Sequence, residues 1–124
     1  MSKTIGVIGT RSRDSEEDFK EVWREFGKWY EPGDKICSGL CPKGGDRFAV
    51  VIANKLNFNE EERIWYPANW DKNGKAAGFI RNIDIARESD ILIACVSSDR
   101  TGGTEDTIKK FLINHQRDRL SIVE

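Results

Sequence analysis

Short apolar runs alternate with segments of helical periodicity along the whole chain. The runs are strand-sized, as expected for strands buried inside a sheet, and they fall at residues 4–9, 35–38, 62–66, 91–96 and 120–123. The run at 91–96 (Ile-Leu-Ile-Ala-Cys-Val) is the most apolar of them. We therefore expect that strand to be central in the sheet and covered on both faces.

The segments between these runs have apolar residues at spacings of three and four, which is typical of helices with one buried face. The first begins at Ser15, a capping hydroxyl followed by three acids. Its apolar stripe comprises Phe19, Val22, Trp23, Phe26 and Tyr30. Three further helices are predicted after residue 45, over 79–88 and after residue 103, and the polar stretch 67–78 is predicted to be a loop.

This order of elements predicts the fold. Strands separated by helices need crossover connections, which favour a parallel sheet with helices on both faces. We predict a Rossmann-like α/β fold, a three-layer α/β/α sandwich around a mostly parallel five-stranded sheet, forming one domain over residues 1–124. Ligands of such sheets bind at the carboxyl ends of the strands, and those ends lead here into the loops at 9–15, 39–45, 67–78 and 97–103.

Composition and charge exclude several function classes. The chain has 124 residues with 20 Lys+Arg against 21 Asp+Glu, so no excess of positive charge favours direct binding of nucleic acid. No apolar run approaches the roughly 20 residues of a membrane span, and the amino terminus leads straight into a strand pattern rather than a signal peptide. Three cysteines in a chain of this size indicate a reduced, cytoplasmic protein. The cysteines and the single histidine lack metal-ligand spacing, so we expect neither a metal nor a cofactor.

The glycine-rich segment at residues 38–47 is the first candidate site. A strand that runs through glycines into a helix leaves backbone N–H groups and a positive helix end for an anion. The candidate contacts are Ser38, Gly39, Lys43, Gly44, Asp46 and Arg47. The P-loop and dinucleotide spacings are absent, and a tight turn that binds no ligand is the alternative.

The segment at residues 98–107 is a second loop of the same kind. Thr101, Gly102, Gly103 and Thr104 lie between a strand and a helix. In the alternative interpretation, Thr101 or Thr104 caps the helix and the acids Glu105 and Asp106 balance its dipole. Two such loops at one sheet edge favour a ligand that carries phosphate.

Three side chains in and after the third loop complete the candidate site. Trp70 offers a ring for base stacking, unless it pins the loop to the core. Arg81 and Asn82 offer donors to phosphate and sugar oxygens, although Arg81 could instead pair with an acid on its own helix. Thr10 and Arg11, after the first strand, belong to the same edge.

Four motifs in register resemble the YspA-like branch of the SLOG superfamily. They are SGLCPKGGDRFA at 38–49, YPANW at 66–70, GKAAGFIRN at 74–82 and TGGT at 101–104. The resemblance implies a Rossmann-like sheet that binds nucleotides or nucleotide-derived ligands, in bacterial or phage conflict systems. Related LOG enzymes, which are similar to lysine decarboxylases, cleave nucleoside monophosphates with a PGGxGTxxE loop and an upstream arginine.

The resemblance to LOG enzymes implies a catalytic role for some of these residues. Arg81 matches the arginine, whereas Thr107 stands where the motif has its glutamate. If the chain is an enzyme, the acid is then Glu105, Asp106 or Asp46. We expect a nucleotide-binding module, with an N-glycosidase or a protein-interaction domain as alternatives. Because LOG relatives pair through helices, we also expect a homo-oligomer, with Trp23, Trp29 and Tyr30 in the core or at a subunit contact.

Overall fold

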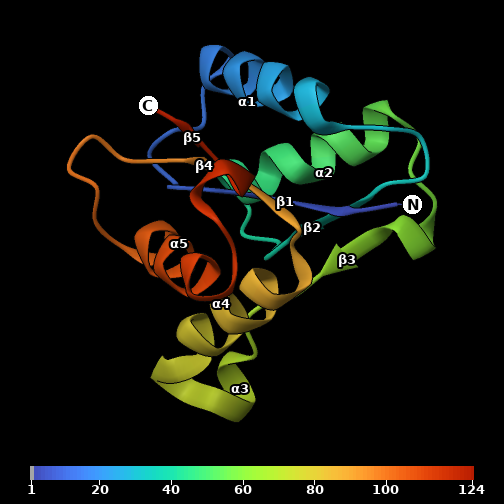
Figure 1. The fold of residues 1–124 in the computed structure, drawn as a ribbon. Helices are drawn as coiled ribbons and strands as arrows, with labels where there is room; N and C mark the ends of the chain where they lie inside the picture. Colours follow the sequence, from blue (N-terminus) through green and yellow to red (C-terminus); the bar gives the residue numbers. More distant parts are fainter. Residues whose placement is uncertain (1) are drawn as a thin grey trace.

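The computed structural model describes residues 2–124, which form a parallel sheet with helices on both faces (Figure 1). The strands lie in the order β3-β2-β1-β4-β5, and every neighbouring pair is parallel. This confirms the predicted Rossmann-like α/β fold. The strands are β1 (Thr4–Gly9), β2 (Lys35–Ser38), β3 (Arg63–Trp65), β4 (Ile91–Cys95) and β5 (Leu120–Val123).

The helices lie in two layers, with α1 and α2 on one face of the sheet and α4 and α5 on the other (Figure 1). Ser15 caps α1 as predicted, because its side chain accepts from the Asp18 N–H and the Asp18 carboxylate accepts from the Ser15 N–H. The helices are α1 (Glu16–Trp29), α2 (Gly45–Lys55), α3 (Trp70–Asn73), α4 (Ala77–Glu88) and α5 (Gly103–Asn114), with 3-10 turns η1 (Glu60–Glu62), η2 (Gly74–Ala76) and η3 (Arg117–Arg119).

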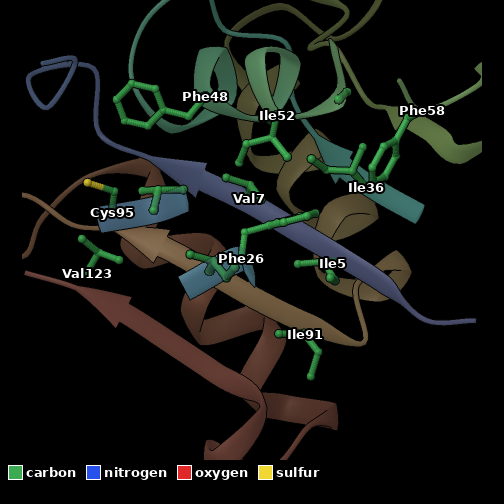
Figure 2. Packing of buried hydrophobic residues seen from close by; sticks show 14 residues of the cluster. Ile5, Val7, Phe26, Ile36, Phe48, Ile52, Phe58, Ile91, Cys95 and Val123 are labelled. Carbon is green, nitrogen blue, oxygen red and sulfur yellow. The ribbon is translucent and has the colours of Figure 1, made fainter. Parts of the chain in front are cut away.

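Each face of the sheet has its own apolar core. Figure 2 shows the core under α1 and α2, where Phe26 and Ile52 pack over Val7. On the opposite face, Ile85 and Phe111 pack against Leu92. Every residue of β4 is buried, as predicted, but the middle strand of the sheet is β1 rather than β4.

The aromatic stripe of α1 divides between core and surface. Phe26 is buried, and Trp29 and Tyr30 pack partly against the same cluster. Trp23 is 37% exposed. Most of the aromatic side chains of α1 therefore belong to the core, as one of the two predicted alternatives had it. A subunit contact through Trp23 stays a prediction.

The segment at 67–78 is more ordered than the predicted loop. It holds α3 and η2, and α4 begins at Ala77 rather than at residue 79. The Asn69 side chain starts α3 by accepting from the Lys72 N–H at 3.0 Å. A helix of four residues is too short to show periodicity, so the sequence pattern could not reveal it.

The strand order places a topological switch between β1 and β4. From β1 the chain adds β2 and β3 on one side, and β4 and β5 lie on the other. At this boundary the loops after neighbouring strands leave toward opposite faces, which opens a crevice at the carboxyl ends. The backbone of Thr10 closes the strand pair there, donating to the Cys95 carbonyl at 3.0 Å.

Candidate functional site

A cavity of about 340 Å³ opens at this switch point. Its walls come from the loop after β1, the loop before α2, the inner face of α4 and the first turn of α5. The lining residues are Ile8, Gly9, Thr10, Arg11, Cys41, Asp46, Arg81, Asn82, Ile85, Thr101, Gly102, Gly103, Thr104 and Thr107. The carboxyl ends of the strands, where the sequence predicts a ligand, therefore surround a cavity, and residues from both glycine-rich loops line it.

The amino terminus of α5 lies at the wall of this cavity. Gly102 precedes the helix, and within residues 2–124 no side chain caps it. The first N–H groups of an uncapped helix have no partner inside the helix and carry partial positive charge. The predicted cap by Thr101 or Thr104 is wrong, because Thr104 lies inside the helix and the Thr101 hydroxyl donates to Asp99 at 2.9 Å. The other part of that alternative is confirmed, because the acids Glu105 and Asp106 do lie in the first turn. The N-cap residue is Gly102, which has no side chain to satisfy the first N–H groups of the helix. The wall of the cavity therefore favours anions.

Arg81 brings a guanidinium from α4 to the edge of the loop before α2. Its Nη1 donates to the Gly39 carbonyl at 3.0 Å, and its Nε donates to Asn82 Oδ1 at 3.2 Å. Nη1 also lies 3.8 Å from Asp46 Oδ2. The side chain is only 19% exposed, so the predicted alternative of a surface pair with an acid of its own helix is not what the structure shows.

Asp46 is a carboxyl group at the wall of the cavity and is only 7% exposed. Its Oδ2 accepts from the Cys41 N–H at 3.0 Å, and its Oδ1 lies 2.9 Å from Ser38 Oγ. Burial raises the pKa of Asp46, and this effect outweighs the hydrogen bonds and the Arg81 charge, which lower it. The site thus contains one carboxyl group that resists ionisation.

Arg11 supplies the second cation of the cavity lining. It is exposed in the loop after β1, and in residues 2–124 it forms neither an ion pair nor a side-chain hydrogen bond. Its charge is therefore available to a ligand. Of the groups that line the cavity, two are cationic and one is a carboxyl group.

Asn82 lines the cavity, but its amide is engaged within the protein. The Nδ2 atom donates to Asp106 at 3.0 Å and to the Gly103 carbonyl at 3.3 Å. Asn82 therefore ties α4 to the first turn of α5. A contact from Asn82 to a sugar stays a prediction.

Seven predicted residues do not line the cavity. Ser38 and Gly39 lie directly behind it, as partners of Asp46 and Arg81. Arg47 turns away to Asp14, with Nε 2.7 Å from Oδ1, and this bond lowers the pKa of Asp14. Glu105 pairs with Arg100 at 2.8 Å. The others are the exposed Lys43, Gly44, whose N–H donates to Asp14, and Trp70.

Trp70 lies on α3, outside the cavity lining. It is 57% exposed and borders a separate shallow hollow formed by residues 67–71. The alternative of a tryptophan buried to pin the loop is therefore wrong. Its predicted role as a stacking partner for a base stays a prediction.

Sequence reasoning missed five lining residues. Ile8, Gly9 and Ile85 belong to the strand end and the helix face that form the apolar floor. Cys41 belongs to the first glycine-rich loop but is not among its predicted contacts, and Thr107 is predicted only to depart from the LOG motif. The Thr107 hydroxyl donates to the Gly103 carbonyl at 3.1 Å. Its place one turn after the glycines was the available signal, since that position faces the same side of the helix.

Metal binding, cysteine chemistry and membrane insertion each need side chains of a particular kind. Residues 2–124 contain no cluster of histidine, cysteine and acidic groups that could hold a metal ion. All three cysteines are free, and burial raises the pKa of Cys37 to about 12 and that of Cys95 to about 11. No helix in this range is long and apolar enough to cross a membrane.

The comparisons with known proteins assign no function to the chain, so a function has to be inferred from the site. No family model, curated protein or solved structure matches the chain. What is established is a Rossmann-like parallel α/β fold, with a cavity at its switch point that two arginines, a helix amino terminus and a buried carboxyl group line.

Proposed function

We propose that this protein binds a nucleotide, or a signalling molecule derived from one, through its phosphate group. One observation carries the proposal: Arg11, Arg81 and the uncapped amino terminus of α5 surround the same cavity at the switch point. Guanidinium groups and free helix N–H groups are the donors that proteins use for phosphate oxygens. The cavity volume of about 340 Å³ lies within the range of small-molecule pockets.

The apolar floor of the cavity offers a surface on which the nucleoside part of the ligand can pack. Ile8 and Ile85 lie beside the polar walls, and a nucleoside would cover them while its phosphate meets the arginines. This division into an apolar surface and a few directed polar groups is typical of ligand sites. The resemblance to the YspA-like SLOG proteins is the ground on which we also propose a role in a bacterial or phage conflict system.

A panel of nucleotides measured by thermal shift tests the proposal. It should include nucleoside mono-, di- and triphosphates, cyclic nucleotides and ADP-ribose-type molecules. A ligand at about 100 times its Kd adds about 2.7 kcal/mol to the free energy of unfolding, which raises Tm by several degrees in a domain of this size. No shift with any member would contradict the proposal and favour the protein-interaction alternative, for which a pull-down is the next experiment.

A second prediction concerns Gly39, which makes room for Arg81. An ideal Cβ at Gly39 would lie 2.4 Å from Arg81 Nη1 and 2.9 Å from Asp46 Oδ2. Because the arginine tip can move aside, we expect Gly39→Ala to change the free energy of unfolding by less than about 1 kcal/mol. The ligand found in the panel should nevertheless bind at least about tenfold more weakly, a loss of about 1.4 kcal/mol.

The matched control is Gly78→Ala in α4. There a new Cβ would meet only the Trp70 ring, at an ordinary 3.7 Å. Titration calorimetry of the ligand against both variants compares their Kd values. If Gly39→Ala bound the ligand as tightly as the Gly78 variant, the geometry of Arg81 would not matter for binding.

The buried acid supports an N-glycosidase as a second candidate function. Cleavage of a nucleoside monophosphate needs an acid or base near the bond that breaks and donors that hold the phosphate. Asp46 and Arg81 line the same cavity, whereas Glu105 does not. Incubation with nucleoside monophosphates, followed by chromatography, should then show free base in wild type and none in Asp46→Ala. Absence of free base at high protein concentration would leave binding alone.

A further inference from the structure

We propose that Asp46 is a positioning residue that acts as a neutral carboxylic acid, and that an oxyanion binds in the cavity more tightly when Asp46 is protonated than when it is ionised. The inference rests on the proposed function and deepens it, because it assigns a protonation state to the oxyanion site. It comes from the hydrogen-bond geometry around Ser38.

The Ser38 hydroxyl faces two acceptors with a single hydrogen. Its Oγ lies 2.6 Å from the Val7 carbonyl oxygen and 2.9 Å from Asp46 Oδ1. If Asp46 is ionised, the hydroxyl can satisfy only one of these oxygens. The other contact then brings two oxygen atoms together without a hydrogen between them, inside a buried part of the protein, which is costly.

A proton on Asp46 resolves this conflict. The carboxyl group then donates from Oδ1 to Ser38 Oγ, and the hydroxyl donates to the Val7 carbonyl. The other oxygen, Oδ2, still accepts from the Cys41 N–H at 3.0 Å. Every short contact of the group is then a hydrogen bond, and burial favours the same neutral form.

The charged and titratable groups around Asp46 fit this assignment. Arg81 from α4 faces it at 3.8 Å, a distance longer than a hydrogen bond. The Cys37 thiol on β2 is held neutral, with its pKa raised to about 12, and the loop before α2 contributes Cys41. Arg11, from the loop after β1, lines the same cavity.

Protonation of Asp46 changes the net charge of the cavity lining. With Asp46 neutral, Arg11 and Arg81 give the lining two positive charges, which match an oxyanion with two negative charges. With Asp46 ionised, a carboxylate would face that oxyanion across the cavity and would keep part of the attraction of Arg81. Binding of the oxyanion therefore favours the protonated form, and by linkage the protonated form favours binding.

Sulfate is the probe for the test, because it keeps its double negative charge throughout the pH range used. Its affinity is measured by titration calorimetry between about pH 5 and 8, where an unperturbed histidine is the side chain that ordinarily titrates. The single histidine, His115, lies at the far end of α5 from the cavity. For wild type we expect affinity to fall as pH rises, by up to about tenfold per pH unit for one linked proton.

Asp46→Asn and Asp118→Asn are the matched variants. Both remove one negative charge, but Asp118 is 72% exposed and precedes β5, at the edge of the sheet opposite the cavity. We expect the pH dependence to disappear in Asp46→Asn, because the amide donates at every pH, and to persist in Asp118→Asn. Persistence of the slope in Asp46→Asn, or a flat profile in wild type over a range in which the Asp46 carboxyl titrates, would overturn the inference while leaving the oxyanion site intact.

A direct titration covers the case in which Asp46→Asn does not fold. The carboxyl carbon of Asp46 in ¹³C-labelled wild type is followed by NMR against pH, with and without sulfate. We expect the pKa of Asp46 to be higher in the presence of sulfate, and an equal pKa in both titrations overturns the inference. If sulfate binds at no pH, the proposed function itself fails, which is a different result from binding without a linked proton.

Discussion

Replacing Arg81 with alanine is expected to weaken binding of a phosphate-bearing ligand by about 30-fold to several-thousand-fold. Removing one partner of a buried, hydrogen-bonded charge pair typically costs about 2–5 kcal/mol, and each 1.4 kcal/mol is about a factor of ten in Kd. Arg81 meets these conditions, because its side chain is 19% exposed and its guanidinium lies on the cavity wall. The measurement is a titration of the ligand found in the nucleotide panel, or of sulfate.

Two further variants make this result specific. Arg87→Ala removes the same charge from an exposed position on the same helix, outside the cavity lining, and we expect its affinity to match wild type within about twofold. Arg81→Lys keeps the charge but loses the planar fork that contacts Gly39 and Asn82, so it should bind with intermediate affinity. If Arg81→Ala bound as tightly as Arg87→Ala, Arg81 would have no role in binding.

Replacing Gly45 with alanine is expected to destabilise the fold by more than about 3 kcal/mol, at the upper end of the range for single substitutions. Gly45 is the first residue of α2, and it rests directly on the end of β1. An ideal Cβ there would lie 2.1 Å from the Ile8 carbonyl carbon and 2.2 Å from the Gly9 nitrogen. Both are backbone atoms of a strand at the centre of the sheet, so no side chain can move aside.

Gly27 in α1 provides the opposite control. It is exposed, and an added Cβ would meet nothing within 4 Å. Alanine at an unobstructed position inside a helix stabilises by about 0.5–1 kcal/mol. Urea unfolding of both variants should therefore move the transition midpoint in opposite directions. A loss of less than about 1 kcal/mol for Gly45→Ala would show that α2 can shift away from β1 at little cost.

The glycine-rich segment at 38–47 has the pattern of a phosphate-binding loop, but its residues serve two purposes. Part of it serves packing: Gly45 lets α2 touch β1, and Arg47 turns away to Asp14. Another part of it forms or supports the walls of the cavity, namely Ser38, Gly39, Cys41 and Asp46. Glycines between a strand and a helix are needed for either purpose, so the sequence alone cannot separate them.

The order of strands and helices followed from the sequence alone, because it depends on local patterns. The run at 91–96 is apolar at every position, which identifies a strand covered on both faces. The capping hydroxyl of Ser15 and the apolar stripe after it identify α1. α3 escaped prediction because four residues make little more than one turn.

Only the tertiary structure decided which residues form the site. Asp46, Arg81 and Gly102 lie in three different connections, and the switch between β1 and β4 brings their segments together. Whether an arginine faces a cavity or an acid depends on partners distant in the chain, as Arg81 with Gly39 and Arg47 with Asp14 show. Periodicity and capping act over a few residues, whereas these contacts arise only when crossover helices set the loops side by side. The sequence therefore determined which edge of the sheet to examine, and the packing of α2, α4 and α5 determined which side chains meet there.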